Sequence, residues 1–282
     1  MKNAQERRVR VLRLWCAVWL LASACQPDPP QLGSHAYERR SSDCGPGSRL
    51  GLAGIWDDER SATGMRYSVR TPANYDPRSA HPLLMVYAPA GLNRFGSESL
   101  TGLTTAATRA GFIVSYASHR RLSLDVIEDL GTIPGRIAEK WCVDPDRIFF
   151  TGHSDGGTVA VALAVLEHTR HLPAAIAPSA AGFTAQDLAA FACPAPLSVM
   201  VMHGAEDRHF PGYGQQLADW WATCNRCGKP AGPRRTDGCR SYPECAGGVR
   251  TLYCEGTGSH LEWPDLNPQL LAFFSGLGPY RP

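Results

Sequence analysis

Short apolar runs alternate along the chain with longer segments in which apolar residues recur at helical spacing. Apolar runs bounded by turn residues are typical of strands buried on both faces of a sheet. The runs predicted as strands span residues 82–87, 112–116, 147–151, 174–177, 197–202 and 249–253. The segments predicted as helices span residues 103–110, 125–141, 156–167, 215–221 and 269–274. This alternation predicts an α/β domain with a mostly parallel central sheet covered by helices on both faces.

Polar stretches and a proline help to define the limits of this domain and of its elements. Residues 67–70 alternate between apolar and polar side chains, which favours an edge strand. Residues 25–55 are rich in Pro, Gly, Ser and charged residues, so we expect a linker there. Pro134 predicts that the helix of residues 125–141 begins late, because proline is best tolerated in the first turn. The folded domain is therefore expected over residues 56–282.

The first 24 residues have the pattern of an export signal. Five basic residues precede an apolar run over residues 14–21, and residues 21–24 supply the small side chains that a signal peptidase needs. The apolar run is too short to span a bilayer as a stable anchor. Cys25 follows directly, in an arrangement that resembles a bacterial lipoprotein signal and predicts lipidation of Cys25. Ordinary secretion and a retained cytosolic helix are the alternatives.

Composition narrows the classes of protein further. The chain has 282 residues, 44% of them hydrophobic, and 10 cysteines. A hydrophobic content near the globular average excludes a disordered chain and a multi-span membrane protein. Because 28 basic residues face 26 acidic ones, the charge gives no reason to expect a nucleic-acid partner. Removal of residues 1–24 takes away five basic residues and one acidic residue, which changes the net charge from +2 to −2.

Residues 151–157, with the sequence Thr-Gly-His-Ser-Asp-Gly-Gly, lie between a predicted strand and a predicted helix. This is the context of the Gly-x-Ser-x-Gly nucleophile elbow. In that elbow the serine occupies a strained turn, and small neighbours let the strand and the helix approach each other. We therefore predict that Ser154 is a nucleophile. The alternative is a Gly-rich loop whose serine caps the helix.

A nucleophilic serine needs a histidine base and a carboxylate that orients it. In this kind of fold the chain order is serine, acid, histidine. The histidines after Ser154 are His168, His171, His203, His209 and His260. Only His260 follows the last predicted strand in a Gly-rich loop, so it is the predicted base. Asp207, just past the strand of residues 197–202, is the predicted acid, and the adjacent Glu206 is the alternative.

Two backbone amides would complete such a site by binding an oxyanion. The amide of Asp155, directly after the serine, is one predicted donor. The other should come from the loop Ala88-Pro89-Ala90-Gly91, which follows the strand of residues 82–87. Because Pro89 has no N–H, we predict Ala90 as the second donor, with Gly91 as the alternative.

Four motifs follow one another in the chain. They are Val143-Asp144-Pro145-Asp146-Arg147-Ile148, the serine motif, His203-Gly204-x-x-Asp207 and Gly258-Ser259-His260-x-x-Trp263-Pro264. Together they resemble the secreted polyhydroxybutyrate depolymerase and feruloyl esterase group of α/β-hydrolases, over roughly residues 60–275. The resemblance implies the α/β-hydrolase fold and an exported, disulfide-stabilised serine esterase. It makes Ser154 the nucleophile, Asp207 the acid and His260 the base.

The chain departs from that group at three places. Ala88-Pro89 stands where the group usually has His-Gly. This departure lies in the loop that should supply the second oxyanion donor and puts that donor in question. Leu261-Glu262 places two residues, rather than one, between the histidine and Trp-Pro. Ser259 replaces the usual glycine before His260. The last two differences could reshape the acyl or leaving-group pocket.

Eight cysteines lie beyond Cys25, namely Cys44, Cys142, Cys193, Cys224, Cys227, Cys239, Cys245 and Cys254. In an exported chain this even number predicts four disulfides. Five of the eight lie in a Pro/Gly-rich insertion, residues 224–254, which is too small to pack an apolar core of its own. Their odd number predicts a bond to Cys193, Cys142 or Cys44 outside it. The alternative is a zinc site formed by Cys224, Cys227, Cys239 and Cys245.

These inferences predict a monomeric serine carboxylic ester hydrolase, extracellular or held in a bacterial cell envelope, that forms an acyl-enzyme without metal or cofactor. The expected substrates are hydroxyalkanoate oligomers or feruloyl and acetyl esters of polysaccharide, because the chain leaves no room for a separate polymer-binding domain. Membrane contact is expected only through a lipid on Cys25. The alternatives are a catalytically weak or inactive hydrolase-fold binding lipoprotein and a peptidase. Trp220, Trp221 and Trp263 could line an aromatic pocket, although such residues are more often part of the core.

Overall fold

The computed structural model describes residues 44–45, 47–228 and 231–277. These belong to one compact unit, Ser41–Pro282. The predicted signal of residues 1–24 and the predicted lipid site Cys25 lie outside the described residues. Within the described ranges, no helix is long and apolar enough to cross a membrane.

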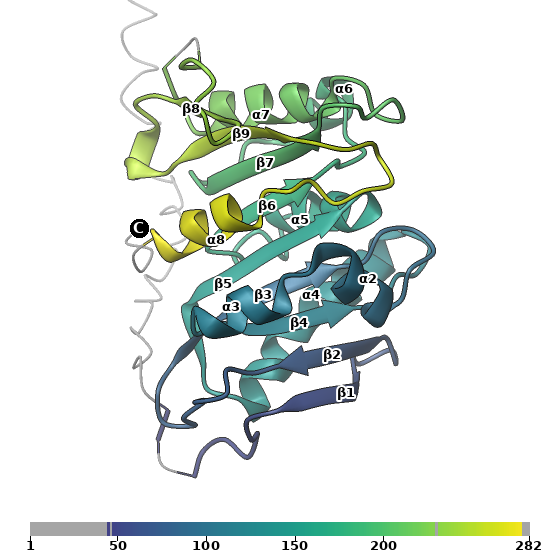
Figure 1. Cartoon of the computed structure of the whole chain (residues 1–282), viewed down its shortest axis with the longest axis vertical. Helices are drawn as coiled ribbons and strands as arrows, with labels where there is room; N and C mark the ends of the chain where they lie inside the picture. Colours follow the sequence, from purple (N-terminus) through teal and green to yellow (C-terminus); the bar gives the residue numbers. More distant parts are fainter. Residues whose placement is uncertain (1–43, 46, 229–230, 278–282) are drawn as a thin grey trace, which may run out of the picture. The chain divides into compact units, whose positions relative to one another are not determined.

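A nine-stranded sheet forms the centre of the described chain (Figure 1). Its strands are β1 (Ile55–Arg60), β2 (Arg66–Arg70), β3 (His81–Tyr87), β4 (Ile113–Ala117), β5 (Val143–His153), β6 (Ala175–Ser179), β7 (Ser198–Gly204), β8 (Cys239–Tyr242) and β9 (Thr251–Gly256). Their order across the sheet is β1-β2-β4-β3-β5-β6-β7-β9-β8. The strands from β4 to β9 in that order pair in parallel, and only the outer pairings, β1 with β2, β2 with β4 and β8 with β9, are antiparallel. The predicted mostly parallel sheet is confirmed.

Helices cover both faces of this sheet, as the alternation predicts. The helices are α2 (Arg94–Thr101), α3 (Thr104–Arg109), α4 (Leu124–Lys140), α5 (Asp155–Val165), α6 (Ala185–Leu188), α7 (Tyr213–Cys224), α8 (Asn267–Ser275) and the short 3-10 turn η1 (Ala246–Gly248). Apolar residues of α4, α5 and α7 form one buried cluster, and those of α3 and α8 contribute to a second. Consecutive residues of β5 divide between the two, because side chains alternate along a strand. Phe150 lies in the first cluster, whereas Phe149 lies in the second and stacks on Phe274 of α8.

The outer strands differ from the sequence prediction. Residues 67–70 are not an edge strand, because β1 pairs with the outer side of β2. Strand β1 contains three acidic residues among its six and therefore gives no apolar pattern. The guanidinium of Arg70 in β2, almost fully buried, pairs with Asp57 of β1 at 2.8 Å and with Glu98 of α2 at 2.6 Å. Strand β1 is thus held by strand pairing and ion pairs, together with the packing of Trp56 on Trp141 of the core.

Helix α4 does not begin late. It starts at Leu124 because the Ser123 side chain accepts a hydrogen bond from the Val126 amide, as an N-cap residue does. Pro134 is accommodated inside the helix, where it is buried. Three short elements of eight, four and four residues, α2, α6 and β8, were not predicted.

Four disulfides use all eight cysteines beyond Cys25. They are Cys44–Cys142, Cys193–Cys224, Cys227–Cys245 and Cys239–Cys254. The predicted disulfides are confirmed, and Cys224 is the cluster member that pairs outside, with Cys193. The zinc alternative is wrong, because all four of its proposed ligands are disulfide-bonded. The bond at Cys44 also fastens part of the predicted linker of residues 25–55 to the start of β5.

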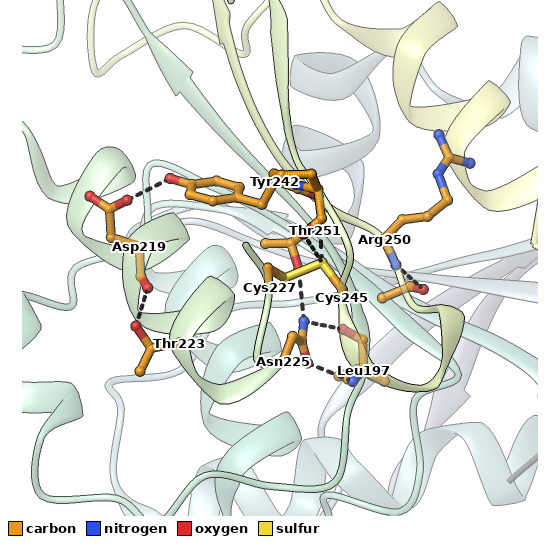
Figure 2. The surroundings of a disulfide bond; sticks show 11 residues. Leu197, Asp219, Thr223, Asn225, Cys227, Tyr242, Cys245, Arg250 and Thr251 are labelled. Carbon is orange, nitrogen blue, oxygen red and sulfur yellow. Dashed lines mark hydrogen bonds between the residues drawn. A yellow bond between two sulfur atoms is a disulfide. The ribbon is translucent and has the colours of Figure 1, made fainter. Parts of the chain in front are cut away.

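The Cys-rich insertion is held to the sheet by hydrogen bonds as well (Figure 2). Asn225, directly after α7, is fully buried; its Oδ1 accepts from the Leu197 amide at 3.0 Å. Its Nδ2 donates to the Leu197 carbonyl at 2.7 Å and to Oγ1 of Thr251 at 2.8 Å. One side chain therefore joins the end of α7 to the beginnings of β7 and β9, beside the Cys227–Cys245 bond.

Candidate active site

Ser154 lies at the tight turn between β5 and α5. Its φ of 54° and ψ of −116° place it in a region that non-glycine residues rarely occupy. Neighbouring glycines allow this turn. A Cβ on Gly156 would overlap the carbonyl oxygen of Tyr87 in β3, and one on Gly157 would lie 2.5 Å from the carbonyl oxygen of Ser179 in β6. The predicted requirement for small residues is therefore met by close backbone approaches on two sides of the serine.

The structure brings Ser154, His260 and Asp207 together although they lie on three different loops. The Oγ of Ser154 is 2.9 Å from Nε2 of His260, and Nδ1 of His260 is 2.8 Å from Oδ2 of Asp207. Because a carboxylate only accepts, Nδ1 carries the proton and Nε2 of the neutral ring accepts the serine O–H. The side chain of His260 is 13% exposed and that of Asp207 is 0% exposed. The order of hydrogen bonds is that of a serine nucleophile, its base and an orienting acid.

Asp207 is fixed by its own loop. Its Oδ1 accepts from the amides of His209 and Phe210, both at 2.9 Å, while Oδ2 accepts from His260. Burial by itself would raise the pKa of Asp207, but the Phe210 amide and His260 outweigh it and the net pKa lies below the usual value. The carboxylate is therefore ionised at neutral pH. Glu206, the alternative acid, has an exposed side chain.

The loop that carries His260 is docked tightly on the end of β7. Its backbone passes so close to Gly204 that a Cβ there would lie 2.5 Å from the carbonyl oxygen of Gly258. The amide of Glu206 donates to that same carbonyl at 3.1 Å. Ser259, one of the departures from the related group, donates through its amide and its hydroxyl to Glu262, at 2.8 Å and 2.9 Å. Ser259 and Glu262 thus close the turn on either side of the histidine.

His153 is a site residue that the sequence analysis missed. It is buried beside Ser154, and its Nε2 donates to the carbonyl oxygen of His260 at 2.8 Å. Its Nδ1 lies 3.0 Å from Oγ of Ser179, which donates to it in this tautomer. Burial lowers the pKa of His153, so the ring stays neutral. The only signal in the sequence was its place between Gly152 and the predicted nucleophile Ser154.

A second buried histidine lies behind the acid. His203, the second-to-last residue of β7, has its Nε2 3.5 Å from Oδ2 of Asp207. A Cβ on Gly214 would lie 2.8 Å from the Cβ of His203. Burial lowers the pKa of His203, against the opposing effect of Asp207. A neutral histidine therefore lies next to the buried carboxylate of Asp207, in addition to His260.

Aromatic rings line the approach to His260. The Phe210 ring meets the His260 ring edge-on, with 4.7 Å between the ring centroids, and stacks on Tyr213 at 5.1 Å. The ring of the exposed His209 lies 4.6 Å from that of His260. Of the three tryptophans considered as a pocket, Trp263 lies near the site, edge-on to His153 at 6.1 Å. Trp221 is fully buried in the core, and Trp220 packs on it. The core interpretation holds for that pair.

Two of the backbone amides near the serine turn, those of Asp155 and Ala90, have no hydrogen-bond partner among the described residues. Asp155 is the first residue of α5, where amides have no partner within the helix and the helix dipole favours an anion. In the loop after β3, the Leu92 amide donates to Pro89 at 3.2 Å and the Gly91 amide to Nδ1 of His119 at 3.4 Å. Of the two alternatives for the second donor, the structure leaves the amide of Ala90 available.

No protein-family model and no curated protein matches this chain. Solved structures match the fold at low sequence identity. An acetyl xylan esterase from Aspergillus awamori is 14% identical with a TM-score of 0.58, covering 80% of this chain and 100% of its own. A truncated carbohydrate esterase from gut microbiota is 11% identical with a TM-score of 0.57, covering 82% and 97%.

A third match bears the name of a different enzyme class. A Bacteroides ovatus protein, provisionally named a dipeptidyl aminopeptidase IV, is 14% identical with a TM-score of 0.57, covering 82% of this chain and 36% of its own. Such identities speak for the fold and not for an activity. Together with the sheet order and the serine turn, they show that this chain has the α/β-hydrolase fold.

Proposed function

We propose that this protein is an exported serine esterase. The observation that carries the proposal is the continuous hydrogen-bond chain from Ser154 through His260 to Asp207, with the serine held at a positive φ. A capping serine would need no such partners. The fold alone would also be compatible with a binding protein, so the argument rests on these three side chains.

The proposed reaction passes through an acyl-enzyme. The Oγ of Ser154 attacks the ester carbonyl carbon while Nε2 of His260 takes the hydroxyl proton, and Asp207 stabilises the resulting imidazolium. The amides of Asp155 and Ala90 bind the oxyanion. Collapse releases the alcohol, which receives the proton from His260. Water then repeats the sequence and releases the acid, so that no metal or cofactor is required.

Two classes of ester are the proposed substrates, hydroxyalkanoate oligomers and feruloyl or acetyl esters of polysaccharide. The names of two proteins with the same fold, an acetyl xylan esterase and a carbohydrate esterase, support testing the second class first. The half-buried rings of Phe210 and Tyr213 beside His260 offer a surface on which a planar acyl group or a sugar ring could stack.

We also infer export, because a set of four disulfides is typical of proteins in an oxidising compartment. The signal of residues 1–24 and lipidation of Cys25 remain part of this proposal. A mass measurement of the exported protein would distinguish a lipidated N-terminal cysteine from an unmodified one.

The decisive experiment compares the wild type with Ser154→Ala. Wild-type protein should hydrolyse short p-nitrophenyl esters and react with a fluorophosphonate probe, and the variant should do neither. Peptide p-nitroanilides, tested alongside, address the peptidase alternative. If the wild type neither turns over esters nor reacts with the probe, the protein is the binding module of the alternative proposal. Undiminished turnover by Ser154→Ala would remove the serine from the mechanism.

A further inference from the structure

His119 connects the two loops that supply the proposed oxyanion amides. It follows β4, and its imidazole is largely buried, with 16% of the side chain exposed. Its Nε2 lies 2.9 Å from Oδ2 of Asp155, the residue after the nucleophile. Its Nδ1 lies 3.4 Å from the amide nitrogen of Gly91 in the loop after β3. No motif in the sequence marks this residue.

These contacts set the protonation of the ring. An amide can only donate, so Nδ1 of His119 accepts from Gly91. The proton of the neutral ring is then on Nε2, from which it is donated to the carboxylate of Asp155. The ring therefore acts as a donor toward one loop and as an acceptor toward the other.

The loop after β3 has a shape that needs such a partner. Residues 89–92 form a tight turn, closed by the Leu92 amide on the Pro89 carbonyl, in which Gly91 has a φ of 78°. With the Leu92 amide used inside the turn and the Gly91 amide directed to His119, the Ala90 amide is the one left for a ligand among the described residues. Tilting of this turn would move that amide.

The side chain of Asp155 works against its own backbone amide. The amide is proposed to bind an oxyanion, yet the carboxylate is negative and would oppose negative charge that develops nearby. The hydrogen bond from His119 directs the carboxylate toward the loop after β4 and partly compensates its charge.

We propose that His119 is a positioning residue that holds the amides of Ala90 and Asp155 in the geometry of one oxyanion hole. This inference rests on the proposed esterase function and deepens it. The support comes from the loop after β4, since Ala88 and Pro89 offer no side-chain hydrogen bond within their own loop. Because fixed donors are worth most when they need no reorganisation, the effect should appear in the chemical step.

The imidazole can be removed without releasing its loop. The amide of His119 donates to the Leu92 carbonyl at 3.1 Å, and Oγ of Ser118 accepts from the Arg94 amide at 3.1 Å. These bonds do not involve the ring, so a variant should keep the loop in place.

Three variants separate the two contacts. His119→Ala removes both. The amide oxygen of His119→Asn can occupy the place of Nδ1 and accept from Gly91, whereas the amide nitrogen of His119→Gln can reach the place of Nε2 and donate to Asp155. His168→Ala, an exposed histidine after α5, is the matched control. The measurements are kcat and KM for p-nitrophenyl acetate, the inhibition constant of a trifluoromethyl ketone, which forms a tetrahedral oxyanion on the serine, and Tm.

For His119→Ala we expect kcat to fall on the order of tenfold to a hundredfold with KM within about twofold of the wild type. The trifluoromethyl ketone should bind more weakly by a similar factor, because its adduct with the serine carries an oxyanion like that of the transition state. The Asn and Gln variants should lie between, and His168→Ala should match the wild type.

A kcat within twofold of the wild type for His119→Ala overturns the inference. This holds also when the same variant has a lower Tm or a higher KM, because either change would then reflect stability or substrate binding and not the chemical step. These outcomes leave the proposed function intact as long as the wild type, but not Ser154→Ala, reacts with the fluorophosphonate. If the wild type itself fails to react, the proposed function fails and the role of His119 fails with it.

Discussion

Asp207→Asn isolates the electrostatic part of the candidate triad, because the substitution changes one oxygen to a nitrogen of nearly the same size. Oδ1 can keep its bonds from the amides of His209 and Phe210, both at 2.9 Å, so the loop should keep its shape. The atom facing Nδ1 of His260, now 2.8 Å away, becomes an N–H donor. Nδ1 must then accept, and the ring proton moves to Nε2.

In that tautomer Nε2 donates toward Ser154 and cannot take its proton. The expected loss of kcat is about 10⁴-fold, and at 1.36 kcal/mol for each tenfold this is about 5 kcal/mol of transition-state stabilisation. Because the side chain is 0% exposed, water cannot replace the lost carboxylate. Circular dichroism and a cooperative urea transition should show that the variant is folded.

The assay is hydrolysis of p-nitrophenyl acetate at pH 8, with the rate of fluorophosphonate labelling as a second measure. Glu206→Gln is the matched control, since it makes the same chemical change at the neighbouring exposed carboxylate. Its activity should be that of the wild type. The reasoning is refuted if Asp207→Asn retains more than about a tenth of wild-type kcat while folded, or if Glu206→Gln loses as much as Asp207→Asn.

Three further predictions concern stability. Gly156→Ala should lower the free energy of unfolding by roughly 3 kcal/mol or prevent folding, because its Cβ overlaps backbone of β3; urea titration measures this. His153 and His203 have pKa values lowered by burial, so the unfolded chain binds protons more readily than the folded one as the pH falls below about 6.5; the urea midpoint should therefore drop between pH 7.5 and pH 5. Replacing both Cys44 and Cys142 with alanine opens a loop with a sequence separation of 98 and should cost about 4 to 5 kcal/mol, read from the same titration.

Each of these has an outcome that contradicts it. Gly135→Ala is the control for Gly156→Ala and should be neutral or slightly stabilising, because nothing lies within 4 Å of the new Cβ. If Gly135→Ala lost as much stability as Gly156→Ala, the steric explanation of the Gly156 effect would be wrong. A urea midpoint that is constant from pH 7.5 to pH 5 would contradict the buried histidines. An unchanged midpoint after removal of the Cys44–Cys142 bond would mean that this cross-link does not constrain the unfolded chain.

Much of this fold could be predicted because its central elements carry local signals. The apolar runs of β3, β4 and β7 exceed what a turn or a surface segment tolerates, and each is followed by a segment with helical spacing. The elements that were missed lack such signals. Strand β1 is polar, and α2 buries polar residues such as Arg94, Ser97 and Thr101. Their state depends on partners from elsewhere in the chain.

The sequence by itself determined the serine turn, since Gly-x-Ser-x-Gly between a strand and a helix is a local arrangement with a local steric reason. It also determined which residues could serve as acid and base, through chain order and loop setting. The tertiary structure decided everything that joins distant segments. Asp207 and His260 are 53 residues apart, and Ser154 and His260 are 106 apart.

The tertiary structure also decided the cysteine pairing and the contacts of His153 and His119. Spacing along the chain allows 105 pairings of eight cysteines, and only the positions of strands and loops select one. A histidine gives no sign in the sequence of whether its ring bonds to the backbone of His260 or bridges Gly91 and Asp155. The physical reason is that hydrogen bonds and disulfides depend on distances in space, which the sheet order sets and the local pattern does not.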